Sequence, residues 1–149
     1  MRYSMPSFIK GFYGIDSTSV TAGGSGDATA INGVAIDRDS MYSGQVNVSY
    51  DATLSTDETL TLAMKLQHSD DGTNFEDFVT LDNEVVLATA KGVVSRNFSL
   101  RAAKKYIRLV VTPDMSASDT DTASIGGTVV LTGSDKNALS EGTVARPWL

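Results

Sequence analysis

The sequence predicts an all-β fold, a single antiparallel β-sandwich of jelly-roll or Ig-like type with extended N- and C-terminal arms. Apolar residues alternate with period two in several short runs, and turn-forming residues separate these runs. The chain has 149 residues, of which 41% are hydrophobic and 20% charged, enough for one folded domain. We divide it into an N-terminal arm and linker (residues 1–31), a sandwich domain (32–133) and a C-terminal tail (134–149).

Each predicted strand follows from its own pattern. The runs "QVNVSY", "TLTLAMKLQ" and "YIRLVVT" alternate, and "VVSRNFSL" and "GTVVL" are rich in β-branched and aromatic residues. The predicted inward-facing residues of the alternating runs are Val46, Val48 and Tyr50, then Leu60, Leu62, Met64 and Leu66, then Ile107, Leu109 and Val111. The segments "STDE", "SDDGTN", "LDNE", "AKG" and "TPDMSASDTDT" predict turns. Only "SLRAAKKY" is compatible with a helix, of about one turn.

The N-terminal arm contains the aromatic residues Tyr3, Phe8, Phe12 and Tyr13, followed by the small, polar stretch "STSVTAGGSGDATA". This stretch offers little surface to bury, so it predicts a flexible link. The aromatic side chains need burial, and two arrangements remain open. They fold back over one end of the core, or they anchor the arm on a neighbouring subunit. The same two alternatives apply to Trp148 in the tail.

The stretch "HSDDGTNF" contains the only histidine and several oxygen ligands. A calcium loop needs oxygen ligands at positions 1, 3 and 5 and a bidentate acid at position 12, and the series starting at Asp70 fails at Gly72. A series starting at Ser69, with Asp71 and Thr73, is nearly neutral and provides weak ligands for calcium. Asp71-Gly72 instead tolerates positive φ, as a hairpin loop requires. In such a loop, Asp70 and Asn74 can bond to nearby backbone amides. We therefore predict a hairpin turn without a metal, and we interpret His68 as a structural side chain.

Composition excludes several other classes of function. The chain has no cysteine, which excludes disulfides, a thiol nucleophile and a zinc–thiolate site. One histidine, with no nucleophile motif and no glycine-rich phosphate loop, predicts a protein that is not an enzyme and carries no cofactor. A net charge of −6 argues against general nucleic-acid binding. No signal peptide or apolar run of about 18 residues is found, so we expect no membrane segment.

Positive charge is concentrated in residues 91–108, which contain six of the twelve basic residues and no acid. Two interpretations remain open: adjacent strands with solvated basic faces, or a basic patch that meets an acidic partner surface, including that of a second copy. The patch consists of Lys91, Arg96, Arg101, Lys104, Lys105 and Arg108.

The motifs "LQHSDDGTNFEDF", "RAAKKYIRLVVTP" and "GGTVVLTG", within residues 33–133, resemble small head decoration, or cement, proteins of tailed bacteriophages. That resemblance implies a β-sandwich, often trimeric, on the outer capsid surface. "SDDGTNF" is also similar to carbohydrate-binding and adhesive sandwiches, and "KYIRL" to discoidin-like domains. No predicted loop, however, has the clustered tryptophans or tyrosines that sugar stacking would need.

The resemblance therefore leads us to expect a noncatalytic virion protein, made in the bacterial cytoplasm, that binds the major capsid protein and stabilises the shell. We expect a homo-oligomer, most simply a trimer, with no nucleic acid or membrane as partner. The alternative is a carbohydrate- or receptor-binding module of a phage tail or fibre. The predicted arm anchors are Tyr3, Phe8, Phe12, Tyr13 and Trp148.

Overall fold

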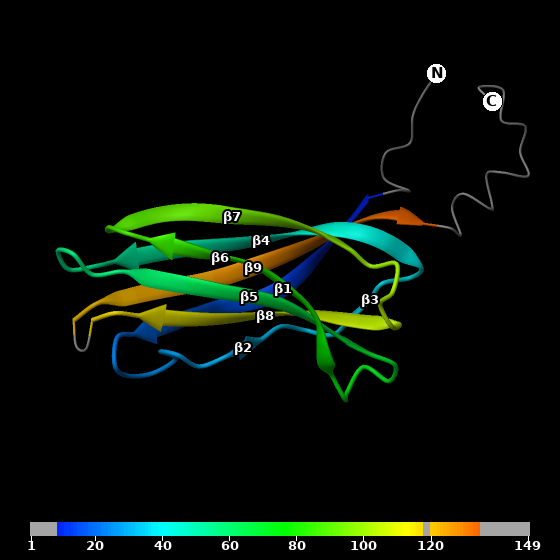
Figure 1. The fold of residues 1–149 in the computed structure, drawn as a ribbon, viewed down its shortest axis with the longest axis horizontal. Helices are drawn as coiled ribbons and strands as arrows, with labels where there is room; N and C mark the ends of the chain where they lie inside the picture. Colours follow the sequence, from blue (N-terminus) through cyan, green and yellow to red (C-terminus); the bar gives the residue numbers. More distant parts are fainter. Residues whose placement is uncertain (1–8, 118–119, 135–149) are drawn as a thin grey trace, which may run out of the picture.

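A computed structural model describes residues 9–117 and 120–134, which form two antiparallel sheets packed face to face (Figure 1). Sheet A contains, in order, β1 (Ile9–Thr21), β9 (Thr122–Ser134), β4 (Met41–Thr53) and β7 (Ala90–Ser99). Sheet B contains β2 (Ile31–Asn32), β8 (Tyr106–Met115), β5 (Leu60–Ser69) and β6 (Glu76–Val86), and β3 (Ile36–Asp37) also pairs with β8. The predicted all-β sandwich is confirmed.

The strand order identifies the sandwich as a jelly roll. β1 pairs with β9, the short strands β2 and β3 pair with β8, β4 pairs with β7, and β5 pairs with β6. If β2 and β3 count as one interrupted strand, the pairs are nested around the β5–β6 hairpin. This is the arrangement that results when one long antiparallel hairpin is rolled into two sheets. Of the two predicted types, the jelly roll is therefore the observed one.

The core lies between the sheets, where the period-two runs place their apolar residues. Leu60, Leu62, Met64 and Leu66 of β5 are at most 1% exposed, as predicted. The other predicted inward-facing residues are also in place: Val46, Val48, Ile107, Leu109 and Val111 are buried, and Tyr50 packs against the core. Each fully buried side chain of this size contributes about 1.5–3 kcal/mol to folding.

The predicted N-terminal arm requires a correction, because residues 9–21 form β1 rather than part of an arm and linker. β1 pairs with β9 along its length, and it buries Ile15 and Val20 in the core. Phe12 packs against that core, whereas Tyr13 is 53% exposed. The sandwich thus includes residues 9–21, which lie before the predicted boundary at residue 32. The segments 1–8 and 135–149, with Tyr3, Phe8 and Trp148, lie outside the described residues.

Three smaller predictions also differ from the structure. "LDNE" is not a turn, because Asp82–Glu84 continue β6, and "AKG" is the start of β7. The actual β6–β7 turn is at residues 87–89. "SLRAAKKY" contains no helix but a single hydrogen-bonded turn at residues 101–102, in which the Ala103 N–H donates to the Leu100 carbonyl at 3.0 Å. The turns at "STDE" and "SDDGTN" are confirmed.

The correction to β1 predicts how truncations behave. A chain of residues 9–149 retains every strand of the structure and should unfold cooperatively, with a midpoint close to that of the full chain. A chain of residues 22–149 loses β1, together with the burial of Ile15 and Val20. Those two side chains alone contribute about 3–6 kcal/mol, a large fraction of the ~5–15 kcal/mol that stabilises a typical domain. Urea unfolding followed by circular dichroism tests this, and equal midpoints for the two truncations would show that β1 is dispensable.

Candidate functional site

The loops of the sandwich gather at its two ends. The loops at residues 38–40, 70–75 and 100–105 lie at the end where β1 begins and β9 finishes, and we call this the terminal end (Figure 1). The loops at residues 22–30, 54–59, 87–89 and 116–121 lie at the opposite end, which we call the acidic end. The two ends differ in the charged residues that they carry.

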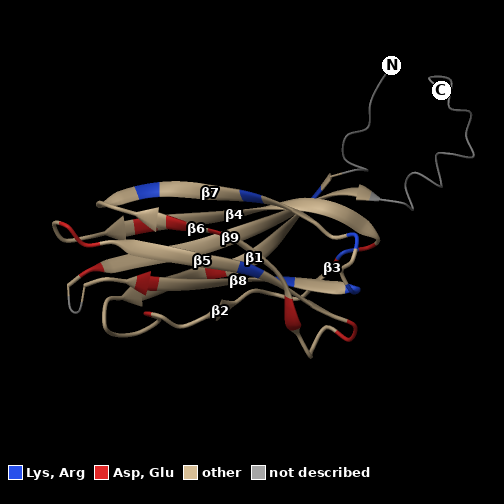
Figure 2. Ribbon diagram, in the orientation of Figure 1, with Lys and Arg blue, Asp and Glu red and all other residues tan. Residues whose placement is uncertain are grey.

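The two ends differ in their balance of acidic and basic residues (Figure 2). Among the described residues, the acidic end has six acids and one base. These are Asp27, Asp51, Asp57, Glu58, Asp114 and Asp121, with Lys91. The terminal end has five bases, Lys10, Arg38, Arg101, Lys104 and Lys105, and five acids, Asp37, Asp39, Asp70, Asp71 and Glu76. The acidic end is therefore strongly negative, whereas bases and acids are equal in number at the terminal end.

The hairpin loop between β5 and β6 is held by one carboxylate. Asp71 Oδ1 accepts the backbone N–H groups of Thr73 and Asn74, both at 2.8 Å, and the Ser69 hydroxyl at 2.8 Å. The Asn74 amide donates to Asp71 Oδ2 at 2.6 Å, and Gly72 takes φ 76°. These donors hold the pKa of Asp71 well below its usual range, the Asn74 and Thr73 N–H groups most strongly. Sequence reasoning assigned this bonding to Asp70 and Asn74, whereas the structure assigns it to Asp71.

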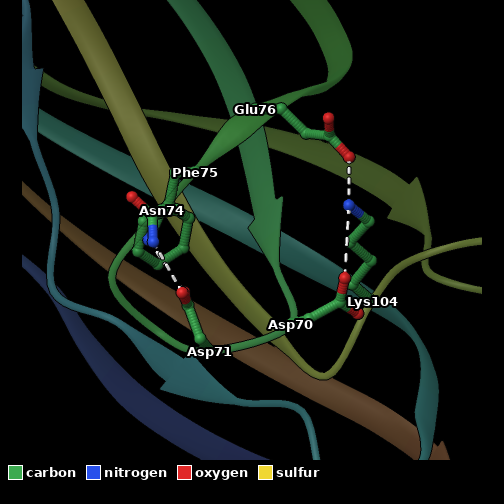
Figure 3. Close-up of a pocket in the computed structure, with 6 residues that line it drawn as sticks. All are labelled: Asp70, Asp71, Asn74, Phe75, Glu76 and Lys104. Atoms are coloured by element: carbon green, nitrogen blue, oxygen red, sulfur yellow. Dashed lines mark hydrogen bonds and ion pairs between the residues drawn. The ribbon is translucent and has the colours of Figure 1, made fainter.

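Beside the hairpin, Lys104 links the β7–β8 loop to the β5–β6 loop across a shallow hollow of about 280 Å³ (Figure 3). Its ammonium group forms ion pairs with Glu76 and, at 3.4 Å, with Asp70. Lys104 holds the pKa of Glu76 below its usual value, and Glu76 raises the pKa of Lys104. The charges at this hollow are therefore paired within the chain, and the pairs join two loops of the terminal end.

His68 is the second link between these loops. Its Nδ1 accepts the backbone N–H of Lys104 at 3.2 Å, so the ring proton lies on Nε2, which donates to Glu76 at 3.1 Å. The ring stacks on Phe78, with centroids 4.8 Å apart. Both ring nitrogens are occupied by protein groups. In this geometry His68 positions the backbone of the β7–β8 loop.

Neither a metal cluster nor a membrane span is found in the described part of the chain. Within residues 9–117 and 120–134, no three His, Asp or Glu residues lie close enough to hold a metal ion. In the same ranges, no helix is long and apolar enough to cross a membrane.

The predicted basic patch is not one surface, because its members are spread over both sheets. Lys91 lies at the acidic end, paired with Asp51 at 2.9 Å. Arg96 joins β7 to β6 by donating to the carbonyls of Asp82 and Asn83 and to Glu84. Adjacent basic strands are also excluded, since β7 and β8 belong to different sheets.

The rest of the patch is closer to the terminal end. Lys105 lies 3.9 Å from Asp37. Arg108 of β8 donates to Gln67 at 2.8 Å and covers the Phe75 ring at 4.3 Å. Arg101 lies 4.9 Å above the Tyr42 ring. Only Arg101, Lys104 and Lys105 share the terminal end, and most of the patch is partnered within its own chain.

Sequence reasoning missed Arg38 and Lys10, which the fold brings to the same end. Arg38 is 63 residues from Arg101, and the pairing of β3 with β8 brings it to the β7–β8 loop. Lys10 reaches Asp39 at 3.1 Å because β1 begins at this end. The stretch "DRD" around Arg38 contains no motif that signals this position.

Apolar side chains are also exposed around the β6–β7 turn. Val85, Leu87 and Val93 are 49%, 71% and 65% exposed and flank the turn at residues 87–89. β6 and β7 are also edge strands of their respective sheets. Exposed apolar groups on strand edges favour association with another chain.

Comparison with known proteins shows likeness in structure only. No known protein family matches the chain, and no curated protein matches its sequence. Solved structures do match. A chain of the T13 viral particle of infectious bursal disease virus (IBDV) superposes with a TM-score of 0.57 and 14% identity, over 83% of this chain and 30% of that one. A chain of the Gx strain of the same virus superposes with a TM-score of 0.56 and 15% identity, over 87% of this chain and 33% of that one.

The jelly roll of this chain thus resembles the fold of chains in a viral particle, and it spans about a third of their length. The CBM36-1 domain of a xylanase from the hindgut metagenome of Trinervitermes trinervoides matches over 82% of this chain and 95% of that domain. Its TM-score is 0.47 at 5% identity, too low to carry an argument. At these identities the likeness concerns the fold.

The Asp71 hairpin predicts a pH-dependent contribution to stability. A depressed pKa in the folded state stabilises the fold above the unfolded value of about 3.9, and this stabilisation is lost as pH falls through the folded value. Asp71→Asn should therefore lower the denaturation midpoint at pH 7, and its difference from wild type should shrink as pH falls below about 4. The matched control is Asp70→Asn, which removes only an exposed ion pair. An Asp71→Asn midpoint equal to wild type at pH 7 would contradict the assignment.

Proposed function

We propose that this protein is a noncatalytic virion structural protein, a capsid decoration or cement protein that binds the outer surface of the shell and bridges capsid subunits. The observation that carries the proposal is the jelly roll shared with chains of a viral particle over at least 83% of this chain. The resemblance of "LQHSDDGTNFEDF", "RAAKKYIRLVVTP" and "GGTVVLTG", taken together, to phage decoration proteins supports it. The main partner is then the major capsid protein of a tailed bacteriophage.

In this proposal the terminal end faces the capsid. Both terminal segments continue from this end, since Ile9 pairs with Thr132 in sheet A. The segments contain Tyr3, Phe8 and Trp148. Each of these aromatic side chains contributes about 1.5–3 kcal/mol if buried on a partner, before ordering costs. The acidic end, with its excess of carboxylates, then faces the solution.

The proposed homotrimer needs a contact other than the basic patch, because most of that patch is already paired within the chain. This contact centres on Leu87, the most exposed apolar side chain of the β6–β7 turn. Val85 and Val93 lie on opposite outer faces of the sandwich, because their neighbours Val86 and Val94 are buried, so each can extend the contact on its own side. The position of the turn between two edge strands leaves the terminal end available for the capsid. Cyclic symmetry around a threefold axis suits a lattice that offers threefold positions.

One observation favours the alternative, a carbohydrate-binding module. The outer face of sheet A has an open hollow of about 430 Å³ bordered by Gln45, Asn97 and Thr132, with Ile9 and Val130 as apolar contacts. Amide and hydroxyl groups of this kind form hydrogen bonds with sugar hydroxyls. A glycan array screened with the full chain tests the alternative, and a hit that Asn97→Ala abolishes would favour it over capsid decoration.

Capsid attachment predicts a specific effect of the terminal segments. Undecorated shells, assembled from the major capsid protein encoded nearest to this gene, are mixed with the full chain or with residues 9–134 and then sedimented. Residues 9–134 retain every described strand, so this chain should fold but bind with at least tenfold lower occupancy at limiting concentration. Lys91→Gln, at the acidic end, is the matched control and should bind as the full chain does. Full occupancy by residues 9–134 would place attachment on the sandwich itself.

Self-association through the β6–β7 turn is tested separately by light scattering. The full chain at micromolar concentration should have three times the 15.8 kDa mass of one chain. Leu87→Asp should shift the protein towards monomer, because it places a charge in an apolar contact. The control is Ala88→Asp, a charge on an exposed neighbour in the same turn. A wild-type monomer, or equal effects of the two variants, would rule out this contact.

A further inference from the structure

A second hollow at the terminal end has a strongly positive lining. It has a volume of about 280 Å³ and is lined by Arg38, Ser40, Tyr42 and Arg101. These residues come from three places in the chain: the β3–β4 turn, the start of β4 and the β7–β8 loop. A backbone hydrogen bond from Leu100 N–H to the Tyr42 carbonyl, at 2.7 Å, joins the last two. Among the described residues, the lining contains two guanidinium groups and two hydroxyl groups, and no carboxylate.

The Arg38 guanidinium is held in a fixed orientation. Its Nε donates to the Lys104 carbonyl and its Nη1 to the Met41 carbonyl, both at 2.8 Å. A guanidinium has five N–H donors, so these two bonds leave three for another acceptor. Arg38 forms no ion pair with a carboxylate in the described part of the chain. Its side chain therefore presents an oriented positive group with unused donors.

Arg101 is positioned by an aromatic ring. Its guanidinium carbon lies 4.9 Å above the centre of the Tyr42 ring, and this cation–π contact orients the plane of the group. Within residues 9–117 and 120–134, Arg101 has no carboxylate within ion-pair distance. Tyr42 thus has two roles at the hollow: its ring supports Arg101 and its hydroxyl adds a donor.

The acids nearest in sequence are engaged with other bases. Asp39 forms an ion pair with Lys10 at 3.1 Å, and Asp37 lies 3.9 Å from Lys105 and accepts the Asp39 N–H at 2.9 Å. Neither carboxylate lines the hollow. Arg38 and Arg101 are therefore the charged groups of its described lining.

The backbone at the rim is in an uncommon conformation. Met41 N–H donates to the Arg38 carbonyl at 2.8 Å, and the two central residues, Asp39 and Ser40, have φ of 46° and 62°. This is a type I′ turn, which usually contains Asn or Gly at these positions. Left-handed backbone at non-glycine residues is kept where the surroundings determine it, and it is frequent at ligand sites. Here it brings the Ser40 side chain to the rim beside Arg38.

We propose that this hollow is an oxyanion-binding site that takes a carboxylate or a phosphate group. Two guanidinium groups with free donors provide charge-assisted, fork-shaped hydrogen bonds, and both acceptor classes match that geometry. The Ser40 and Tyr42 hydroxyl groups complete the shell of donors. The small volume and open shape suit a free small anion or the end of a side chain. The site rests on this geometry alone and does not depend on capsid decoration.

The test is a titration of the ¹⁵N-labelled full chain with sodium phosphate, and separately with sodium acetate, at constant ionic strength. Amide shifts of Ser40, Tyr42 and Arg101 should change in a saturable way and describe one site. The two salts distinguish the sources: tighter binding of phosphate indicates a phosphate ligand, and tighter binding of acetate a carboxylate. Arg101→Gln should weaken binding about tenfold, the effect expected for one lost charge-assisted pair.

Matched variants separate a site from general electrostatics. Lys105→Gln removes one positive charge from the same loop but does not line the hollow, so it should leave the titration within twofold of wild type. Arg101→Lys keeps the positive charge but loses the fork-shaped set of N–H donors of the guanidinium group. Its affinity for the anion should lie between those of wild type and Arg101→Gln. Tyr42→Phe keeps the ring under Arg101 and serves if Arg101→Gln disturbs the fold. Amide shifts that change linearly with the concentration of both salts would overturn the proposal. Equal weakening of anion binding by Lys105→Gln and Arg101→Gln would overturn it too.

Discussion

The pairing of β9 with two strands at once is the constraint on which the sandwich depends. β9, the last described strand, lies between β1 and β4 and forms a ladder with each, so it joins the first described strand to the rest of sheet A. Its inward residues, Ala123, Ile125, Val129 and Leu131, are all buried. The ladders of β9 therefore hold β1 in the sheet and close one side of the core. Until β9 is in place, Ile15 and Val20 of β1 have no sheet on which to be buried, which makes folding depend on contacts between distant parts of the chain.

β5, which sequence reasoning identified, and β1, which it missed, differ in regularity. β5 alternates without interruption on its inward face, from Leu60 to Leu66, and its pattern predicts it directly. β1 contains two register shifts, between Tyr13 and Ile15 and between Ile15 and Thr18. The apolar side chains of β1 that pack in or against the core, Phe12, Ile15 and Val20, are therefore three and five residues apart instead of two. Together with its serines, threonines and glycines, this spacing resembles a linker rather than a strand.

At the terminal end, too, the sequence predicts local features better than contacts between distant residues. The hairpin at "SDDGTN" could be predicted because all its determinants are local, and even there the capping role belongs to Asp71 instead of Asp70. The hollow of Arg38 and Arg101 could not be predicted, because no local pattern links residues 63 positions apart. The run of bases at residues 91–108 suggested one surface, but the chain crosses from sheet A to sheet B within it. Proximity in sequence thus predicted the turns at "STDE" and "SDDGTN" and not the surfaces.

The common exit of the two chain ends has a mechanical consequence. Ile9 and Thr132 are direct partners in an antiparallel ladder, so a pull that separates residues 9 and 134 loads the hydrogen bonds of that ladder one after another. Strands loaded in this way unzip at low force, whereas strands pulled lengthwise in opposite directions share the load among all their bonds. Anchors on a single capsid subunit would put no tension on β1. Anchors on two separating subunits would peel β1 from β9 first, making this pair a built-in mechanical weak point.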